Sequence, residues 1–156
     1  MVEALTLLPR IPGAAPGVDK PSNAGLTIEG SVFSGLGRGA QFLGIEWVRR
    51  ELRQKVVLDP FPGTLNLRIP ADAWSALYAR RTNLVKIADP SAASCPGFLM
   101  HVVLQAQGRF CPSAYVILPE WTIYKDVLEI IAAENLRAKL QIKDGDRVRV
   151  EEFPEP

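Results

Sequence analysis

The sequence predicts a mainly β fold, a β-barrel-like domain with a few short helices around one core. Most apolar residues fall in short alternating runs, which are typical of strands with one buried face. Gly and Pro residues separate these runs, and only two or three stretches show helical spacing. With 156 residues, 47% of them apolar and 22% charged, the chain suits one domain with a sizeable core.

Composition and charge exclude several classes of protein. The 18 basic and 17 acidic side chains give no global charge that would favour nucleic acid or a membrane surface. No apolar run approaches the ~20 residues that span a bilayer. Because Met1–Pro9 has no basic region and carries Glu3, it does not resemble a signal peptide, and we expect a cytoplasmic protein. Cys95 and Cys111 are then reduced thiols, and the single His101 excludes a histidine-based metal cluster.

The first half of the chain divides into an arm and the start of the domain. Residues 1–24 are rich in Pro, Gly and Ala, so we predict an extended or disordered arm, followed by a single domain over 25–153. Residues 26–33 form the first predicted strand. The glycine-dense loop 34–39 follows it, and residues 41–54 show helical spacing, with the basic cluster Arg49, Arg50 and Arg53 on the solvated face.

A rigid turn followed by an alternating strand marks the centre of the chain. Residues 56–59 read as a short β-branched strand that leads into Pro62 and Gly63, which predict a tight turn. From Thr64 onward apolar and polar residues alternate, so Thr64 and Asn66 share one polar face. Neutral oxygens so placed can bind a hard cation such as Mg²⁺, or they can simply face solvent.

The second half of the chain predicts short strands with two brief helices. Apolar alternation predicts strands over 83–88, 98–105, 114–118, 127–131 and 147–150, and helical turns over 70–78 and 135–140. Glu129 is the only acid in its predicted strand. The Asp144-Gly145 pair is a strong turn signal.

The glycine loop permits three interpretations. With a strand before it and a helix after it, the loop imitates a dinucleotide-binding unit, with Gly35, Gly37 and Ala40 in the glycine positions and Asp59 as the ribose-binding acid. A Walker loop is excluded because no Gly-Lys-Ser/Thr follows the glycines. The third interpretation is a hairpin with no ligand, although three glycines in five residues favour close backbone approach to a ligand.

Several motifs stand in the order found in one known family. They are Gly30-x-Val32-x-Ser34-Gly35-Leu36-Gly37-x-Gly39, then Pro60-x-x-Gly63-Thr64-Leu65-Asn66-Leu67, then Glu129 to Ala132, Leu136-Arg137 and Lys143 to Asp146. Over about residues 28 to 150 the chain resembles the archaeal-type CTP-dependent riboflavin kinases. The resemblance implies a six-stranded cradle-loop (RIFT-type) barrel. It also implies an enzyme that transfers the γ-phosphate of CTP to the 5′-hydroxyl of riboflavin, giving FMN and CDP, with no nucleic acid or membrane partner.

The resemblance also implies roles for particular residues. Thr64 and Asn66 would hold Mg²⁺, Thr122 and Glu129 would contact the flavin, and Glu129 would orient or deprotonate the ribityl hydroxyl, unless it is a structural carboxylate. The nucleotide would be bound by two segments, Leu36, Gly37, Arg38, Gly39, Ala40 and Gln41 in the glycine loop and Glu134, Asn135, Leu136 and Arg137 further on. The chain departs from the family pattern at Arg38, where an acid is frequent, and at Tyr124, where some members have histidine.

Three rival functions remain open at the level of sequence. The first is a flavin- or nucleotide-binding sensor without catalysis, which the Arg38 and Tyr124 departures motivate. The second is an NAD(P)-binding oxidoreductase, which rests on the glycine spacing and Asp59. The third is a nucleic-acid-binding barrel, supported only by a short basic cluster that comprises Arg49, Arg50, Arg53 and Lys55.

Overall fold

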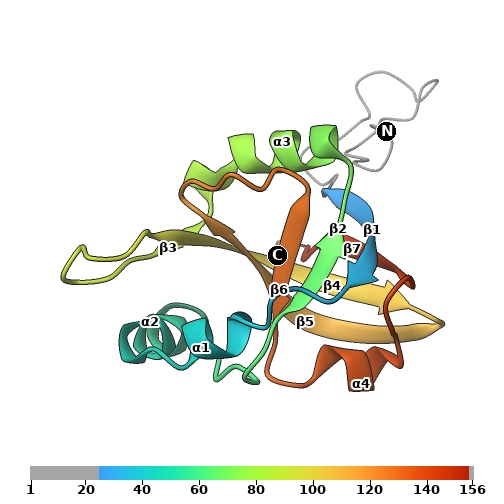
Figure 1. Ribbon diagram of the computed structural model, residues 1–156, viewed down its shortest axis with the longest axis horizontal. Coiled ribbons are helices and arrows are strands. Elements are labelled where there is room, and N and C mark those ends of the chain that lie inside the picture. The colour runs from blue at the N-terminus through green and yellow to red at the C-terminus, as the bar shows by residue number, and fades with distance from the viewer. Residues whose placement is uncertain (1–24, 155–156) are drawn as a thin grey trace.

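The computed structural model describes residues 25–154, so the predicted arm 1–24 lies outside the described residues. Figure 1 shows a β-barrel with short helices at its ends and on one side. The strands are β1 (Thr27–Phe33), β2 (Leu65–Arg68), β3 (Val85–Ile87), β4 (Gly97–Ala106), β5 (Arg109–Pro119), β6 (Val127–Ile131) and β7 (Arg147–Glu152). The helices are α1 (Gly39–Leu43), α2 (Glu46–Val56), α3 (Ala71–Ala79) and α4 (Leu136–Leu140), with a 3₁₀ turn at Arg81–Asn83.

The sheet closes on itself through β4. Its strands follow the order β3-β4-β5-β6-β2-β1-β7, and β4 also pairs with β7. Six strands therefore form a closed antiparallel barrel, and β3 lies outside it, which confirms the predicted six-stranded barrel. The NAD(P)-binding interpretation is wrong, because β1 and β2 pair antiparallel whereas a dinucleotide-binding unit needs parallel strands.

Two apolar cores lie on either side of the barrel wall. The inner core holds the inward-facing residues of all six barrel strands, among them Leu67, Val102 and Ile130. The outer core lies between helices α1 and α2 and the outer face of β3 to β6, and it includes Trp47 and Val48 of α2. None of the described residues is both buried and polar or charged. Polar side chains on the described strands are therefore on surfaces that water reaches.

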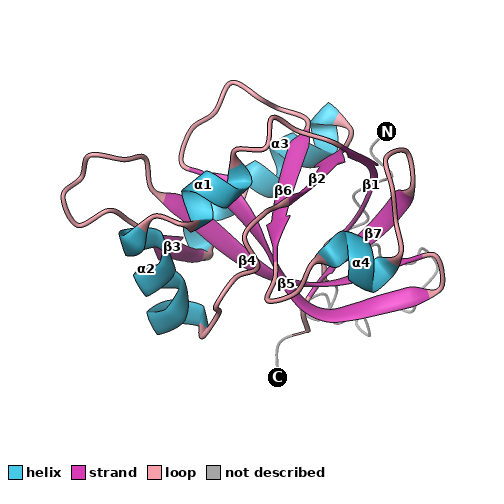
Figure 2. Ribbon diagram, turned by 60° about the horizontal axis from the view of Figure 1, so that its bottom comes forward, coloured by secondary structure: helices cyan, strands magenta, loops and turns pink. Residues whose placement is uncertain are grey.

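The predicted helix over residues 41–54 is in fact two helices. Gly44 ends α1 with its backbone N–H bonded to the carbonyls of that helix, and Ile45 adopts an extended conformation as the N-cap of α2. Val48 and Leu52 are buried as the spacing predicts, but Ile45 is 42% exposed. Figure 2 shows α1 and α2 on one flank of the barrel and α4 on the opposite flank, with β2 and β6 between them.

Residues 56–59 do not form the predicted strand. Val56 is the last residue of α2, and Val57 ends the helix in the left-handed conformation at φ 55°, while the N–H of the next residue, Leu58, bonds to the Leu52 carbonyl at 3.1 Å. The chain then runs through an extended loop in which the Phe61 N–H bonds to the Ala132 carbonyl at 2.8 Å. β-branched residues at a helix end can thus imitate a strand in a sequence pattern.

β5 is longer than predicted because it continues through Pro112. The register of β4 and β5 shifts between Val102, which faces Ala114, and Leu104, which faces Cys111. Pro112 therefore lies in a β-bulge, where its missing N–H leaves no pairing unsatisfied. Cys111 is buried and Cys95 exposed, and both are free thiols as predicted.

The two ends of the barrel carry different elements. α3 follows β2 and lies at the upper end of the barrel in Figure 1, and α4 follows β6 at the lower end. The side chain of Asn135 caps α4 by accepting a hydrogen bond from the Ala138 N–H at 3.2 Å, which is a strong N-terminal cap.

Among the described helices, none is long and apolar enough to cross a membrane.

α2 covers the outer edge of β3, the strand outside the barrel. The Glu51 carboxylate accepts a hydrogen bond from the Ala88 N–H at 3.1 Å, and Lys55 Nζ donates to the Lys86 carbonyl at 2.8 Å. Lys55 and Glu51 also form an ion pair at 3.0 Å. Backbone groups at a sheet edge that would otherwise be open to a second strand are therefore occupied.

We predict that Glu51→Gln destabilises the protein at neutral pH by about 0.5–1 kcal/mol, since it removes the charge from this edge contact. Burial raises the pKa of Glu51, but the Ala88 N–H and Lys55 outweigh burial and hold the pKa below the ordinary 4.5. The carboxylate therefore stabilises the fold above about pH 4.5, and this stabilisation is lost as pH falls through the lowered pKa. Urea unfolding at pH 7 and pH 3 measures the difference, with Glu46→Gln in the same helix as control. An equal difference at both pH values contradicts the prediction.

Candidate functional site

Three predicted site residues meet on the outer face of the barrel, where β2 and β6 pair. Leu65 and Leu67 point into the barrel, so Thr64 and Asn66 point outward. Asn66 lies directly opposite Glu129 in the antiparallel register, and the Thr64 hydroxyl donates to the Asn66 side-chain oxygen at 3.4 Å. A hydroxyl, an amide and a carboxylate therefore share one patch of the barrel wall, which we call the polar patch.

The glycine loop lies directly on the polar patch. A Cβ atom added to Gly39 would lie 2.7 Å from the Thr64 hydroxyl oxygen, and one added to Gly35 would lie 2.4 Å from the Asn66 amide nitrogen. Real side chains do not approach so closely, so a larger residue at either position would force the Asn66 or Thr64 side chain, or the loop itself, to shift. The sequence predicted close backbone approach to a ligand, and the structure adds a close approach to the protein's own β2.

The middle of the glycine loop is open to solvent. Gly37 adopts φ +75° with free space beside its Cα atom, so glycine is needed there for its left-handed conformation rather than for packing. Leu36 is 78% exposed, and Arg38, Ala40 and Gln41 are exposed as well. The loop therefore presents backbone and side chains to a ligand from the side that faces away from β2.

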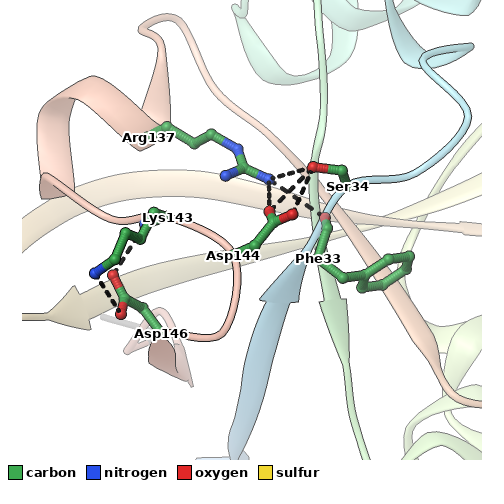
Figure 3. A network of polar contacts seen from close by, with 6 residues as sticks. All are labelled: Phe33, Ser34, Arg137, Lys143, Asp144 and Asp146. Carbon is green, nitrogen blue, oxygen red and sulfur yellow. Dashed lines mark hydrogen bonds and ion pairs between the residues drawn. The ribbon is translucent and has the colours of Figure 1, made fainter.

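A polar network ties the start of the glycine loop to the turn before β7, as Figure 3 shows. Arg137 Nη2 donates to an Asp144 carboxylate oxygen at 2.7 Å. The Ser34 hydroxyl donates to the same carboxylate at 2.9 and 3.0 Å, and Arg137 Nη2 also lies 3.4 Å from the Phe33 carbonyl oxygen. The hydrogen bonds from Arg137 and Ser34 lower the pKa of Asp144, so it is ionised at neutral pH.

Glu129 has an altered acidity that follows from its surroundings. Its other register partner is Ile117 on β5, a member of the outer core. Although the side chain as a whole is exposed, loss of water around the carboxyl raises the pKa of Glu129, and a hydrogen bond with Thr64 opposes that change. A carboxyl with a raised pKa beside a polar patch is suited to accept a proton during a reaction.

The remaining predicted residues lie at the two ends of β6. Thr122 belongs to the loop before β6, where its hydroxyl accepts a hydrogen bond from the Tyr124 N–H at 3.1 Å. Trp121 and Ile123 in the same loop are 70% and 76% exposed, which makes an apolar surface. Glu134 follows β6 and forms an ion pair with Lys139 at 3.3 Å, and it lines a surface pocket with Leu58 and Pro112.

The oxygen atoms of the polar patch fit a hard cation. Among residues 25–154, no group of three or more His, Cys, Asp or Glu side chains is arranged to hold a metal ion. The Thr64 hydroxyl and the Asn66 amide oxygen, 3.4 Å apart, are the kind of neutral donors that Mg²⁺ uses when phosphate groups supply the rest of its coordination. The donor set therefore fits Mg²⁺ that is bound together with a phosphorylated ligand.

The structure brings most of the predicted residues together and adds two that the sequence analysis missed. The glycine loop, Thr64, Asn66 and Glu129 form one surface, and Arg137 reaches the start of the loop. Thr122 makes no recorded contact with that surface within the described residues. Ser34 and Asp144 were predicted only as loop and turn residues. Because they are 110 positions apart, no local pattern could have paired them.

Comparison with known proteins gives a consistent family. The family model CTP-dep_RFKase, described as a domain of unknown function (DUF120), matches residues 32–151. A riboflavin kinase of Aeropyrum pernix is 41% identical over 128 residues, which cover 78% of this chain and 91% of the relative. A riboflavin kinase of Archaeoglobus fulgidus is 35% identical over 133 residues, 81% of this chain and 54% of the relative. The chain thus spans about half the length of the Archaeoglobus relative and most of the Aeropyrum one.

We predict that Gly39→Ala displaces the glycine loop from β2, because the new methyl group would overlap the Thr64 side chain. Amide hydrogen exchange of the loop should rise about 10-fold or more, since contacts that hold the loop closed are lost. Gly44→Ala is the matched control at the end of the same helix, where the nearest atoms lie 3.4 and 3.5 Å away. Unchanged exchange in Gly39→Ala would show that Thr64 moves aside and that the close contact is not restrictive.

Proposed function

This chain belongs to the CTP-dependent riboflavin kinase family, and from that premise we propose that it phosphorylates riboflavin with CTP in the cytoplasm. In the reaction the ribityl 5′-oxygen forms a bond to the γ-phosphorus of CTP while the bond from that phosphorus to the β-phosphate oxygen breaks. FMN and CDP are the products, and the hydroxyl proton passes to a base. The observation that carries the proposal is the glycine loop packed on Thr64 and Asn66, with Glu129 paired opposite Asn66 on the same barrel face.

The order of residues along β6 supports a site with the flavin at one end and the phosphate-donating nucleotide at the other. Thr122 precedes the strand, Glu129 lies within it, and Arg137 follows it near the glycine loop. An elongated flavin lying along this face would place its rings near Thr122 and the exposed Trp121, where apolar contact is available. Its ribityl chain would then reach toward Glu129, and the nucleotide would occupy the space beside the glycine loop.

The glycine loop and Arg137 are the proposed phosphate-binding groups. Backbone N–H groups in a glycine-rich loop can point together at an anion, and all of residues 36–41 except the half-buried Gly39 are exposed. Arg137 and Arg38 add positive charge, which offsets the negative charge of a triphosphate. Phosphoryl transfer needs little covalent chemistry from the protein, so positioning and charge neutralisation are the main contributions of these residues.

Thr64 and Asn66 are the proposed ligands of Mg²⁺. When bound, the ion would neutralise charge on the terminal phosphates of the nucleotide. The two side chains are held in place by the inward packing of Leu65 and Leu67 and by the loop above them. Their rigid placement lowers the entropy cost of binding the metal and nucleotide together.

Glu129 is the proposed base for the ribityl hydroxyl. Burial raises the pKa of Glu129, which makes its carboxylate a better proton acceptor than that of an ordinary glutamate. The interaction with the Thr64 hydroxyl partly offsets the rise in the pKa of Glu129, and this neighbour would help to orient the carboxylate. Proton acceptance and phosphate binding would therefore take place on neighbouring side chains of the polar patch.

Turnover of riboflavin with a panel of nucleotides tests the proposal directly. We expect FMN to form with CTP and Mg²⁺, and we expect kcat/KM for CTP to exceed that for ATP by about 100-fold or more, since a pocket that pairs with a pyrimidine edge rejects a purine. Tight binding of riboflavin or CTP without turnover would instead support a sensor. Equal use of ATP and CTP would show that the base is not recognised.

We predict that Thr64→Val and Asn66→Ala each lower kcat/KM by about 10-fold or more, because each removes one proposed metal ligand. The melting temperature should stay nearly constant, since both side chains point away from the inner core. Thr27→Val and Gln105→Ala are matched controls on outward-facing positions of β1 and β4. Mg²⁺-dependent turnover at the wild-type rate in both variants would exclude Thr64 and Asn66 as metal ligands.

We predict that Glu129→Gln keeps riboflavin affinity within about 3-fold of the wild type but slows transfer by about 100-fold, the usual contribution of a general base. Wild-type kcat should fall as pH drops through the raised pKa of Glu129, and the variant should lose this dependence. Because the pKa is raised in the folded state, the ionised carboxylate destabilises the fold at neutral pH. The variant should therefore be at least as stable as the wild type, and a large loss of stability would identify a structural carboxylate instead.

A further inference from the structure

We propose that Asp144 is a positioning residue for phosphate recognition. It holds one edge of the Arg137 guanidinium against the start of the glycine loop and leaves the other edge available to the phosphates of a nucleoside triphosphate. The inference rests on the proposed function, because it assigns a role within the same nucleotide site.

All of the recorded contacts of the Arg137 guanidinium are made by one nitrogen. Nη2 donates to Asp144 at 2.7 Å and lies 3.4 Å from both the Ser34 hydroxyl oxygen and the Phe33 carbonyl oxygen. Nη1 and Nε have no protein partner within residues 25–154. Since a guanidinium carries five N–H donors in a fixed plane, fixing one edge sets the direction of the other, which is free to bind an anion.

The Asp144 carboxylate is presented by a turn that is itself anchored to β1. The Gly145 N–H bonds to the Val32 carbonyl at 2.8 Å, and the Val32 N–H bonds to the Asp146 carbonyl at 2.9 Å. Within the turn, the Lys143 N–H bonds to the Asp146 carboxylate at 2.9 Å. Gly145 adopts φ +95°, which glycine permits without strain. Asp144 is therefore held at a fixed place beside the end of β1.

Ser34 extends the same arrangement into the glycine loop. Its hydroxyl donates to both oxygens of Asp144, and the next residue, Gly35, packs on Asn66. One carboxylate thus joins the Arg137 side chain to the first residue of the loop. Figure 3 shows the Arg137 guanidinium and the Ser34 hydroxyl side by side, both directed at the Asp144 carboxylate.

Stability alone does not account for this network. The side chains of Arg137 and Asp144 are 37% and 56% exposed, and ion pairs with so much solvent contact contribute little to the free energy of unfolding. A bidentate carboxylate with both an arginine and a serine donor nevertheless restricts the orientation of each donor. The expected consequence of losing Asp144 is therefore weaker nucleotide binding with little change in stability.

Steady-state kinetics of Asp144→Asn and Ser34→Ala test the role, with Glu29→Gln as the matched control. Glu29 also pairs with an arginine of β7, at 3.4 Å, but it has no recorded contact with the glycine loop. For Asp144→Asn we expect KM for CTP to rise about 10-fold, which is the usual effect of losing a charged hydrogen bond. We expect kcat within about 3-fold, KM for riboflavin within about 2-fold and an unchanged melting temperature. Ser34→Ala should show the same pattern to a smaller degree.

A second measurement separates this inference from the proposed function. Titration of the wild type and Asp144→Asn with inorganic tripolyphosphate reports phosphate binding without any need for turnover, and we expect about 10-fold weaker binding to the variant. If the wild type does not phosphorylate riboflavin but this difference is found, the positioning role stands while the kinase proposal fails. The positioning role is overturned if Asp144→Asn binds CTP and tripolyphosphate as tightly as the wild type does. It is also overturned if kcat, both KM values and the melting temperature of the variant all deteriorate together.

Discussion

The close packing of the glycine loop on β2 is the contact on which the rest of the site depends. Gly35 and Gly39 lie so near Asn66 and Thr64 that a methyl group at either position would overlap them. This contact fixes the path of the loop across the outer face of the barrel. It also half-buries the two polar side chains below it, so they keep one arrangement. A loop of glycines, usually a mobile segment, is in this way made part of a defined surface.

Antiparallel pairing of β2 with β6 adds a carboxylate, Glu129, to the site. The register of β2 with β6 places Glu129 opposite Asn66, although 63 positions separate them in the sequence. The pairing of β6 with β5 puts Ile117 on the other side of Glu129, and this apolar neighbour helps to raise the pKa of the carboxyl. One register therefore determines both where the acid lies and how strongly it holds its proton. A shift of one residue would turn Glu129 into the barrel.

Local patterns in the sequence predict the strands well and the long-range contacts poorly. Alternation correctly predicts β2, with Thr64 and Asn66 on its outer face, because one face of the barrel wall is apolar. The same reasoning missed the break at Gly44, since a glycine can occupy either a helix or its end. It also took residues 56–59 for a strand, because the β-branched Val56 and Val57 at the end of α2 imitate a strand pattern. Contacts between Ser34, Arg137 and Asp144 depend on closure of the whole barrel. The family resemblance supplied the remaining site residues, whose roles stay predictions.

The barrel wall has an apolar inner face and an outer face that carries the polar patch, so the same strands can provide both a stable core and a binding surface. Its described residues include no buried polar or charged side chain, so the inner core is stabilised by apolar packing alone. The side chains of the polar patch face outward from the barrel, away from the inner core. A carboxylate with a raised pKa lowers stability at neutral pH, and the separate inner core tolerates that loss. The strands can therefore keep their inward residues for folding while the outward residues of the same strands are free to serve phosphate, metal and flavin binding.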